Sequence, residues 1–166
     1  MARNRDDNLD YWRKREEEAR QNTIKDEAEY SKRLGSFCHL EVEELPESRL
    51  SANPSPAEIE AALRKEGESI ALRIPAGALT IALCVEGKQL SSLRFSQFLE
   101  ACALRGRSRL CFLIGGSEGL SEEIKEKADL RMSMSEMTFP HHLARVMLLE
   151  QLYRAFQIRD GSRYHK

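Results

Sequence analysis

The sequence lacks any hydrophobic run long enough to cross a membrane. No apolar stretch approaches the ~20 residues that a membrane-spanning helix requires. The opening residues, MARNRDDNLD, also lack the apolar core of a secretory signal, so we expect a cytoplasmic protein. Neither sign of charge dominates, because 26 Lys and Arg face 27 Asp and Glu in 166 residues. This length and balance favour a single globular domain, and the net charge alone gives no reason to expect a polyanionic partner.

The sequence also lacks the usual spacings of metal and nucleotide sites. Its four cysteines are widely separated and lie mostly in apolar runs, so we expect buried free thiols: Cys38, Cys84, Cys102 and Cys111. His141 and His142 are adjacent and cannot share one helix face, so we expect no metal. The glycine cluster at residues 115–119 lacks the GK[ST] ending of a P-loop. Taken alone, this cluster is more typical of a tight turn than of a cofactor site.

The first 34 residues differ from the rest of the chain. They hold nine basic and nine acidic residues, and their only large aliphatic side chains are Leu9, Ile24 and Leu34. This composition predicts one long, polar, solvent-facing helix over residues 8–34, or a segment that is partly disordered. We therefore divide the chain into a charged segment, residues 1–34, and a domain, residues 35–166.

Beyond Gly35, patterns typical of strands alternate with patterns typical of helices. The periodicity predicts strands at residues 38–45, 79–85, 110–114 and 129–135. The first of these is expected to have one exposed face, and Gly87 is expected to end the second. Helices are expected from Ser55-Pro56, at residues 91–105, at residues 121–128 behind a Ser121 cap, and at residues 141–159 with Thr138 as cap. Apolar strands separated by helices predict an α/β fold with a parallel sheet covered on both faces.

The predicted last helix, residues 141–159, is apolar around most of its circumference. Glu150, Arg154 and Gln157 form one narrow polar stripe. Such a helix must be covered on two sides, by its own sheet and either by a second subunit or by deep packing within a monomer. Arg145 lies away from the polar stripe, so we expect it either to extend toward solvent or to reach into a site.

Three segments carry a family resemblance when they occur in this order. They are IALCVEGK at residues 81–88, FLIGGSEGL at residues 112–120, and MSEMTFPHH at residues 134–142, followed by Arg145, LYRAF at 152–156 and the ending Tyr164-His165-Lys166. Together they resemble the RlmH family of 23S rRNA pseudouridine-N3 methyltransferases, members of the SPOUT superfamily. The resemblance extends from about residue 29 to the last residue.

The resemblance implies a fold, a cofactor and a partner. It implies a parallel sheet with a C-terminal trefoil (α/β) knot, a homodimer with the last helix at its interface, and 23S rRNA of the ribosome as substrate. It implies S-adenosyl-L-methionine as cofactor, and no metal. By position, the cofactor contacts fall on Leu83, Gly115, Met134, Ser135, Glu136, Met137, Thr138 and Phe139.

The resemblance also implies catalytic roles near the end of the chain. The positions concerned are Arg154, Tyr164 and His165, in a tail expected to fold over the pocket. We expect His165 to accept the N3 proton or orient the base, and Arg154 to stabilise the developing negative charge. The C-terminal end is modestly basic, with five basic and two acidic residues from Met137 onward.

The start of the chain departs from the family pattern. Family members open with an apolar first strand, and here a charged helix is expected in its place. Two alternatives to the rRNA enzyme remain at this stage. One is a SPOUT methyltransferase acting on another RNA, such as a ribose hydroxyl of tRNA, and the other is a non-catalytic RNA-binding or assembly protein.

Overall fold

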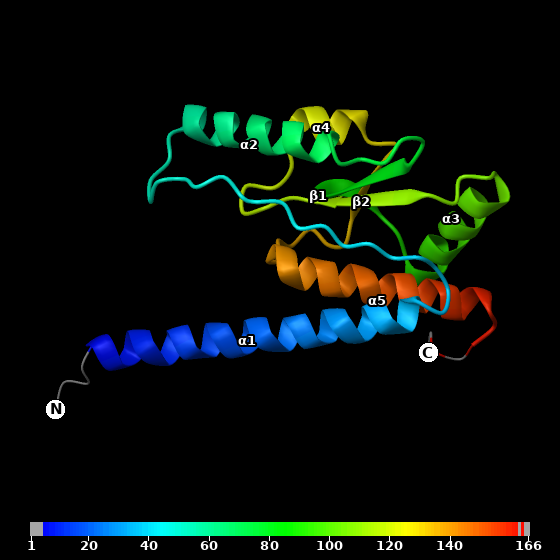
Figure 1. Cartoon of the computed structure of the whole chain (residues 1–166), viewed down its shortest axis with the longest axis horizontal. Helices are drawn as coiled ribbons and strands as arrows, with labels where there is room; N and C mark the ends of the chain where they lie inside the picture. Colours follow the sequence, from blue (N-terminus) through cyan, green and yellow to red (C-terminus); the bar gives the residue numbers. More distant parts are fainter. Residues whose placement is uncertain (1–4, 163, 165–166) are drawn as a thin grey trace.

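The computed structural model describes residues 5–162 and residue 164 (Figure 1). Eight elements follow in the order α1 (Arg5–Leu34), α2 (Pro56–Ala71), β1 (Leu79–Gln89), α3 (Ser92–Leu104), β2 (Leu110–Ile114), α4 (Glu122–Lys127), β3 (Leu130–Ser133) and α5 (His141–Arg159). The predicted α/β class is confirmed.

A three-stranded parallel sheet in the order β2-β1-β3 forms the centre of the fold. Successive residues of β1 point to opposite faces, so Ile81 and Ala82 are both fully buried but in different cores. Ile81 packs with buried side chains of α3 and α5, whereas Ala82 packs with Leu120 and Ile124 on the α4 side. Figure 1 shows α2 and α4 over one face of the sheet and α5 below the other. The sequence expectation of a sheet covered on both faces is confirmed.

Three serines cap the starts of helices, and one of these caps, Ser121, was predicted from the sequence. Ser55, Ser91 and Ser121 each accept a hydrogen bond from the backbone N–H three residues later, which satisfies one donor that a helix start leaves free. At α2, the Glu58 carboxylate also accepts from the Ser55 backbone N–H, and this completes a capping box.

Four local expectations were wrong. Residues 38–45 form no strand, because none of the described strands pairs with this segment. Without a neighbouring strand, its backbone N–H and C=O groups have no partners in a sheet. Strand β1 continues past Gly87 to Gln89, since Lys88 pairs with Met132. Pro140, not Thr138, is the N-cap of α5, and no side chain caps that end. Of the four free cysteines only Cys102 is buried, and the other three are half-buried.

Helix α1 supplies the second cover of α5. Figure 1 shows the two helices side by side and running in the same direction, with α5 between α1 and the sheet. Leu34, at the end of α1, is 0% exposed and lies in the same core as Leu148 and Leu152. Part of the apolar circumference of α5 is thus buried within one chain, at Leu148, Leu149, Leu152 and Ala155, whereas Leu143 remains 42% exposed. None of the described helices is long and apolar enough to span a membrane.

Candidate methyltransferase site

The predicted cofactor residues begin at one edge of the sheet. Leu83 in β1 is paired with Ile114 in β2 and with Met132 in β3. Gly115 directly follows Ile114, and Met134 lies two residues after Met132. Leu83 lies in the middle of β1 but level with the carboxyl end of β2, so it comes close to Gly115 and Met134 at the edge where parallel α/β sheets bind ligands.

The glycine loop at residues 115–119 is built on close backbone contact. A Cβ atom on Gly115 would lie 2.2 Å from the carbonyl carbon of Gly119, so only glycine fits there. Gly116 and Gly119 form an isolated antiparallel bridge that closes the loop. The loop is therefore a tight turn whose backbone segments lie in close contact beside the end of β2.

Glu47 contacts this glycine loop and was not predicted. Its Oε1 accepts a hydrogen bond of 2.6 Å from the Ser117 backbone N–H, and its side chain lies against Gly116. The bonds to Ser117 lower the pKa of the Glu47 carboxyl, and the nearby His141 lowers it further. No sequence signal pointed to Glu47, because it lies some 70 residues away in an irregular segment.

The loop between β3 and α5 carries the remaining predicted cofactor residues. Ser133 Oγ donates to the Ser135 carbonyl at 2.8 Å, and the Met137 backbone N–H donates to Ser135 Oγ at 3.0 Å. These bonds hold the loop in a compact turn. Its members range from partly buried to exposed: Met134, Ser135 and Phe139 are half-buried, whereas Glu136, Met137 and Thr138 are exposed.

A cavity of about 750 Å³ lies beside this loop, between α1, the start of α3 and α5. Its volume is within the range of small-molecule sites. Among the predicted cofactor residues, Met134 lines it, together with Ser133, Ser92 and the two α5 residues Glu150 and Gln151. Asp26 and Tyr30 of α1 form another wall. Met134 therefore connects the loop that carries the predicted cofactor residues to the polar residues of α5.

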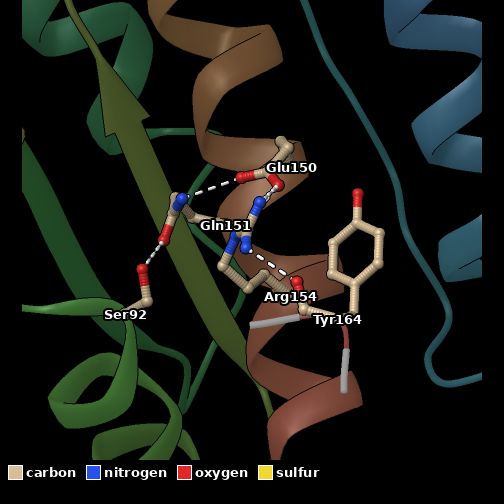
Figure 2. Close-up of polar contacts among 5 residues, drawn as sticks. All are labelled: Ser92, Glu150, Gln151, Arg154 and Tyr164. Atoms are coloured by element: carbon tan, nitrogen blue, oxygen red, sulfur yellow. Dashed lines mark hydrogen bonds and ion pairs between the residues drawn. The ribbon is translucent and has the colours of Figure 1, made fainter. Parts of the chain in front are cut away.

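The predicted catalytic residues Arg154 and Tyr164 contact each other, and Arg154 also contacts Glu150 (Figure 2). Arg154 Nη1 donates to the backbone carbonyl of Tyr164 at 2.9 Å, and its guanidinium carbon lies 4.8 Å from the centre of the Tyr164 ring. Arg154 also forms an ion pair with Glu150, and this contact raises the pKa of the guanidinium. The third predicted catalytic residue, His165, lies outside the described residues.

Aromatic side chains also surround the Tyr164 ring. Tyr153 meets it edge-on with ring centroids 5.1 Å apart, and Tyr30 of α1 packs against Tyr153 at 6.3 Å. Burial raises the pKa of the Tyr30 hydroxyl, and the neighbouring Tyr164 and Glu150 raise it further. Tyr30 is thus a member of the site that the sequence pattern did not reveal, because its helix carries no continuous apolar stripe.

The basic C-terminal end is largely neutralised by ion pairs. Arg145 pairs with Glu27 and Glu44, so it neither extends freely to solvent nor enters the cavity of about 750 Å³. Arg159 pairs with the adjacent Asp160, and Arg154 pairs with Glu150. Arg163 and Lys166 lie outside the described residues. Within the described part of the chain, no group of three or more His, Cys, Asp and Glu is arranged to hold a metal ion.

Comparison with known proteins agrees with this architecture. Residues 14–165 match the family described as "Predicted SPOUT methyltransferase". The chain is 49% identical over 139 residues to ribosomal RNA large subunit methyltransferase H of Streptococcus mutans, an alignment that covers 84% of this chain and 87% of the relative. Proteins of the same name are 48% identical in Leuconostoc mesenteroides, with the same coverage, and 46% identical in Clostridioides difficile, over 83% of this chain and 87% of the relative.

The extent of these matches shows the family. The chain belongs to the SPOUT methyltransferases. Membership implies a methyl donor, and the carboxyl edge fits a small one through the glycine loop and the compact turn after β3.

Proposed function

We propose that this protein transfers a methyl group from S-adenosyl-L-methionine to N3 of a pseudouridine in 23S rRNA of the large ribosomal subunit. The observation that carries the proposal is the convergence of Leu83, Gly115 and Met134 at one sheet edge, next to a cavity that continues to Glu150. The names of the relatives support the substrate class, since each is a large subunit rRNA methyltransferase.

The proposed cofactor supplies a methyl group on a positively charged sulfur, which makes the methyl carbon electrophilic. Leu83 and the loops at Gly115 and residues 134–139 hold it, largely through backbone groups that only a tight turn presents. The substrate N3–H bond must break as the N3–CH₃ bond forms, so a group of the protein has to accept the proton. We assign this role to His165, whose ordinary pKa lies near neutral pH.

We also assign a role to Arg154. Its guanidinium is already paired with Glu150 and bonded to the Tyr164 carbonyl. It therefore holds the backbone at Tyr164, directly before His165 in the sequence, and in this proposal the guanidinium, although paired with Glu150, stabilises the negative charge that develops on the pyrimidine. Tyr164 packs in front of Tyr153 and presents its hydroxyl toward Tyr30.

The knot and the homodimer are part of the proposal. Both follow from the family resemblance, and the dimer would use α5. In this chain α1 already covers part of α5, and a second cavity of about 680 Å³ lies between α1, residues 35–44 and Arg145. Exposed apolar side chains of Ile24 and Val42 line that cavity. A second subunit would therefore meet α1 together with α5.

Methyl transfer from labelled S-adenosyl-L-methionine tests the function. The substrates are ribosomes and free 23S rRNA from a strain that lacks the modification, with tRNA as the comparison. We expect incorporation into 23S rRNA at one pseudouridine, and a loss of about 100-fold or more in His165→Ala and Arg154→Ala, within the range of general acid–base and electrostatic contributions. Label in tRNA alone would identify a different RNA substrate.

Isothermal titration with the cofactor separates an enzyme from a non-catalytic RNA-binding protein. We expect binding that Gly115→Ala abolishes and His165→Ala leaves unchanged. Absence of both binding and transfer in the wild-type protein would refute the proposed function.

A further inference from the structure

The Arg154 guanidinium is held by a carboxylate one helical turn earlier on α5. Arg154 Nε lies 3.0 Å and Nη2 2.5 Å from Glu150 Oε1. Two donors of the rigid guanidinium fork therefore meet one carboxylate oxygen, and this fixes both the position and the plane of the group. The third donor used, Nη1, is left to face Tyr164.

This pair is shielded from solvent. The side chains of Glu150 and Arg154 are 18% and 25% exposed. Exposed ion pairs contribute little, because water and salt screen them, but a shielded charge-assisted bond is stronger and more directional. The contact is therefore able to fix the orientation of Arg154.

Gln151 and Ser92 orient the Glu150 side chain on the side away from Arg154. Gln151 Nε2 donates to Glu150 Oε2 at 2.7 Å, and Ser92 Oγ donates to Gln151 Oε1 at 2.7 Å (Figure 2). Ser92 is the first residue of α3, so this chain of hydrogen bonds connects α3 to Arg154 on α5. Both carboxylate oxygens of Glu150 accept hydrogen bonds: Oε2 accepts from Gln151 and Oε1 accepts from Arg154.

At its far end the chain of hydrogen bonds reaches the C-terminal tail. Arg154 donates to the Tyr164 carbonyl and lies over the Tyr164 ring. The carbonyl carbon of Tyr164 is bonded directly to the backbone nitrogen of His165. A guanidinium that holds this carbonyl therefore holds the backbone at Tyr164, the residue directly before His165 in the sequence.

We infer that Glu150 is a positioning residue, which holds the Arg154 guanidinium so that Arg154 anchors the tail at Tyr164. The catalytic consequence rests on the proposed function, whereas the anchoring of the tail does not. Without the Glu150 carboxylate, Arg154 loses two of its three bonds, and the tail loses its fixed attachment to α5.

Glu150→Gln tests this role, because it keeps the size of the side chain and removes its charge. The matched control is Glu100→Gln, an exposed glutamate on α3. We expect Glu150→Gln to lower kcat for methyl transfer about 10- to 100-fold, as misplaced catalytic groups do, with KM for S-adenosyl-L-methionine within about 2-fold of wild type. Glu150→Asp, which keeps the charge, is expected to recover part of kcat. The control is expected to match wild type.

Amide hydrogen exchange of the C-terminal peptide measures how firmly the tail is held, and it needs no substrate. We expect its amides to exchange faster in Glu150→Gln and in Arg154→Ala than in wild type and the control, with unchanged exchange in β1. Gln151→Met, which removes only the support behind Glu150, is expected to give a smaller change in the same direction. It serves as the test if Glu150→Gln does not fold.

Wild-type exchange of the tail in both Glu150→Gln and Arg154→Ala would overturn the inference. Faster tail exchange with unchanged kcat would overturn its catalytic consequence. An inactive wild-type protein whose tail still depends on Glu150 would refute the proposed function and leave the positioning role supported.

Discussion

Arg145 on α5 lies 3.4 Å from the Glu27 carboxylate on α1 and 3.1 Å from the Glu44 carboxylate. The Arg145 side chain is 17% exposed, so its charge is placed among apolar side chains and relies on these partners. The ion pair between Arg145 and Glu27 is one of the polar contacts by which the strongly charged N-terminal helix attaches to α5.

The first prediction concerns this ion pair. Glu27→Gln should lower the free energy of unfolding by about 1–3 kcal/mol, because it leaves a shielded guanidinium with one acidic partner. Arg145→Met should cost less, since methionine fills the same space without a charge to satisfy. Urea unfolding of both variants and of the double variant measures the coupling. A coupling energy near zero would show that the two charges act independently.

The second prediction concerns Leu34, the fully buried residue at the end of α1. Leu34→Ala should destabilise the protein by about 2–5 kcal/mol, because the cavity forms in the core shared by α5 and the sheet. Leu72→Ala is the control, since Leu72 is 85% exposed and its loss should change stability by no more than about 0.5 kcal/mol. Equal losses for the two variants would contradict the packing described.

The third prediction concerns the first half of α1. Every described side chain from residue 11 to residue 22 is exposed. Deletion of residues 1–19 should therefore lower Tm by less than about 4 °C, which corresponds to roughly 1 kcal/mol for a chain of this size. Thermal melts and light scattering of the same samples check stability and oligomeric state together. A large loss of Tm would show that this half packs against something outside the single chain.

Most elements could be predicted from the sequence because their signals are local. Serine caps begin α2, α3 and α4, and continuous apolar runs form β1 and β2. Residues 38–45 show the limit of local pattern: their alternation is typical of a strand, but a strand also requires a neighbour to pair with. Here no described strand lies beside them.

The candidate site was predictable only where family positions identify it. Leu83, Gly115 and Met134 lie near one edge of the sheet and Arg154 contacts Tyr164, and the roles that the resemblance gives these residues stay predictions. Glu47, Glu150 and Tyr30 join them through contacts that depend on how distant segments pack. The packing of α1 on α5 depends on a few side chains in the last turns of α1, and no periodic hydrophobic pattern in the sequence predicts it.

The fourth prediction concerns pH and His142, the second residue of α5. Burial lowers the pKa of His142, and His141, Arg145 and Arg20 lower it further, whereas Glu44 raises it. The folded state therefore binds a proton less readily than the unfolded state, whose histidine titrates near its ordinary value of about 6.5. As pH falls below that value, the unfolded state gains the proton first and the stability of the fold decreases.

Substitution of His142 checks this assignment. Unfolding free energies measured from pH 8 down to pH 5 should fall less steeply in His142→Gln than in wild type. His39→Gln is the control, because His39 lies on an exposed segment. An identical slope in wild type and His142→Gln would contradict the prediction.

The last prediction compares two neighbouring glycines of the loop after β2. A Cβ on Gly115 would meet the Gly119 backbone, which cannot move without opening the loop, whereas a Cβ on Gly116 would meet the Glu47 side chain at 2.7 Å. A flexible side chain can rotate away, so the two substitutions should differ sharply. Gly115→Ala should abolish detectable binding of S-adenosyl-L-methionine, whereas Gly116→Ala should weaken it by no more than about 10-fold, equivalent to about 1.4 kcal/mol. Glu47→Ala in the Gly116→Ala background should restore part of this loss. Titration calorimetry measures all three variants, and equal binding by Gly115→Ala and Gly116→Ala would show that the close approach of Gly115 to Gly119 is not needed to hold the cofactor.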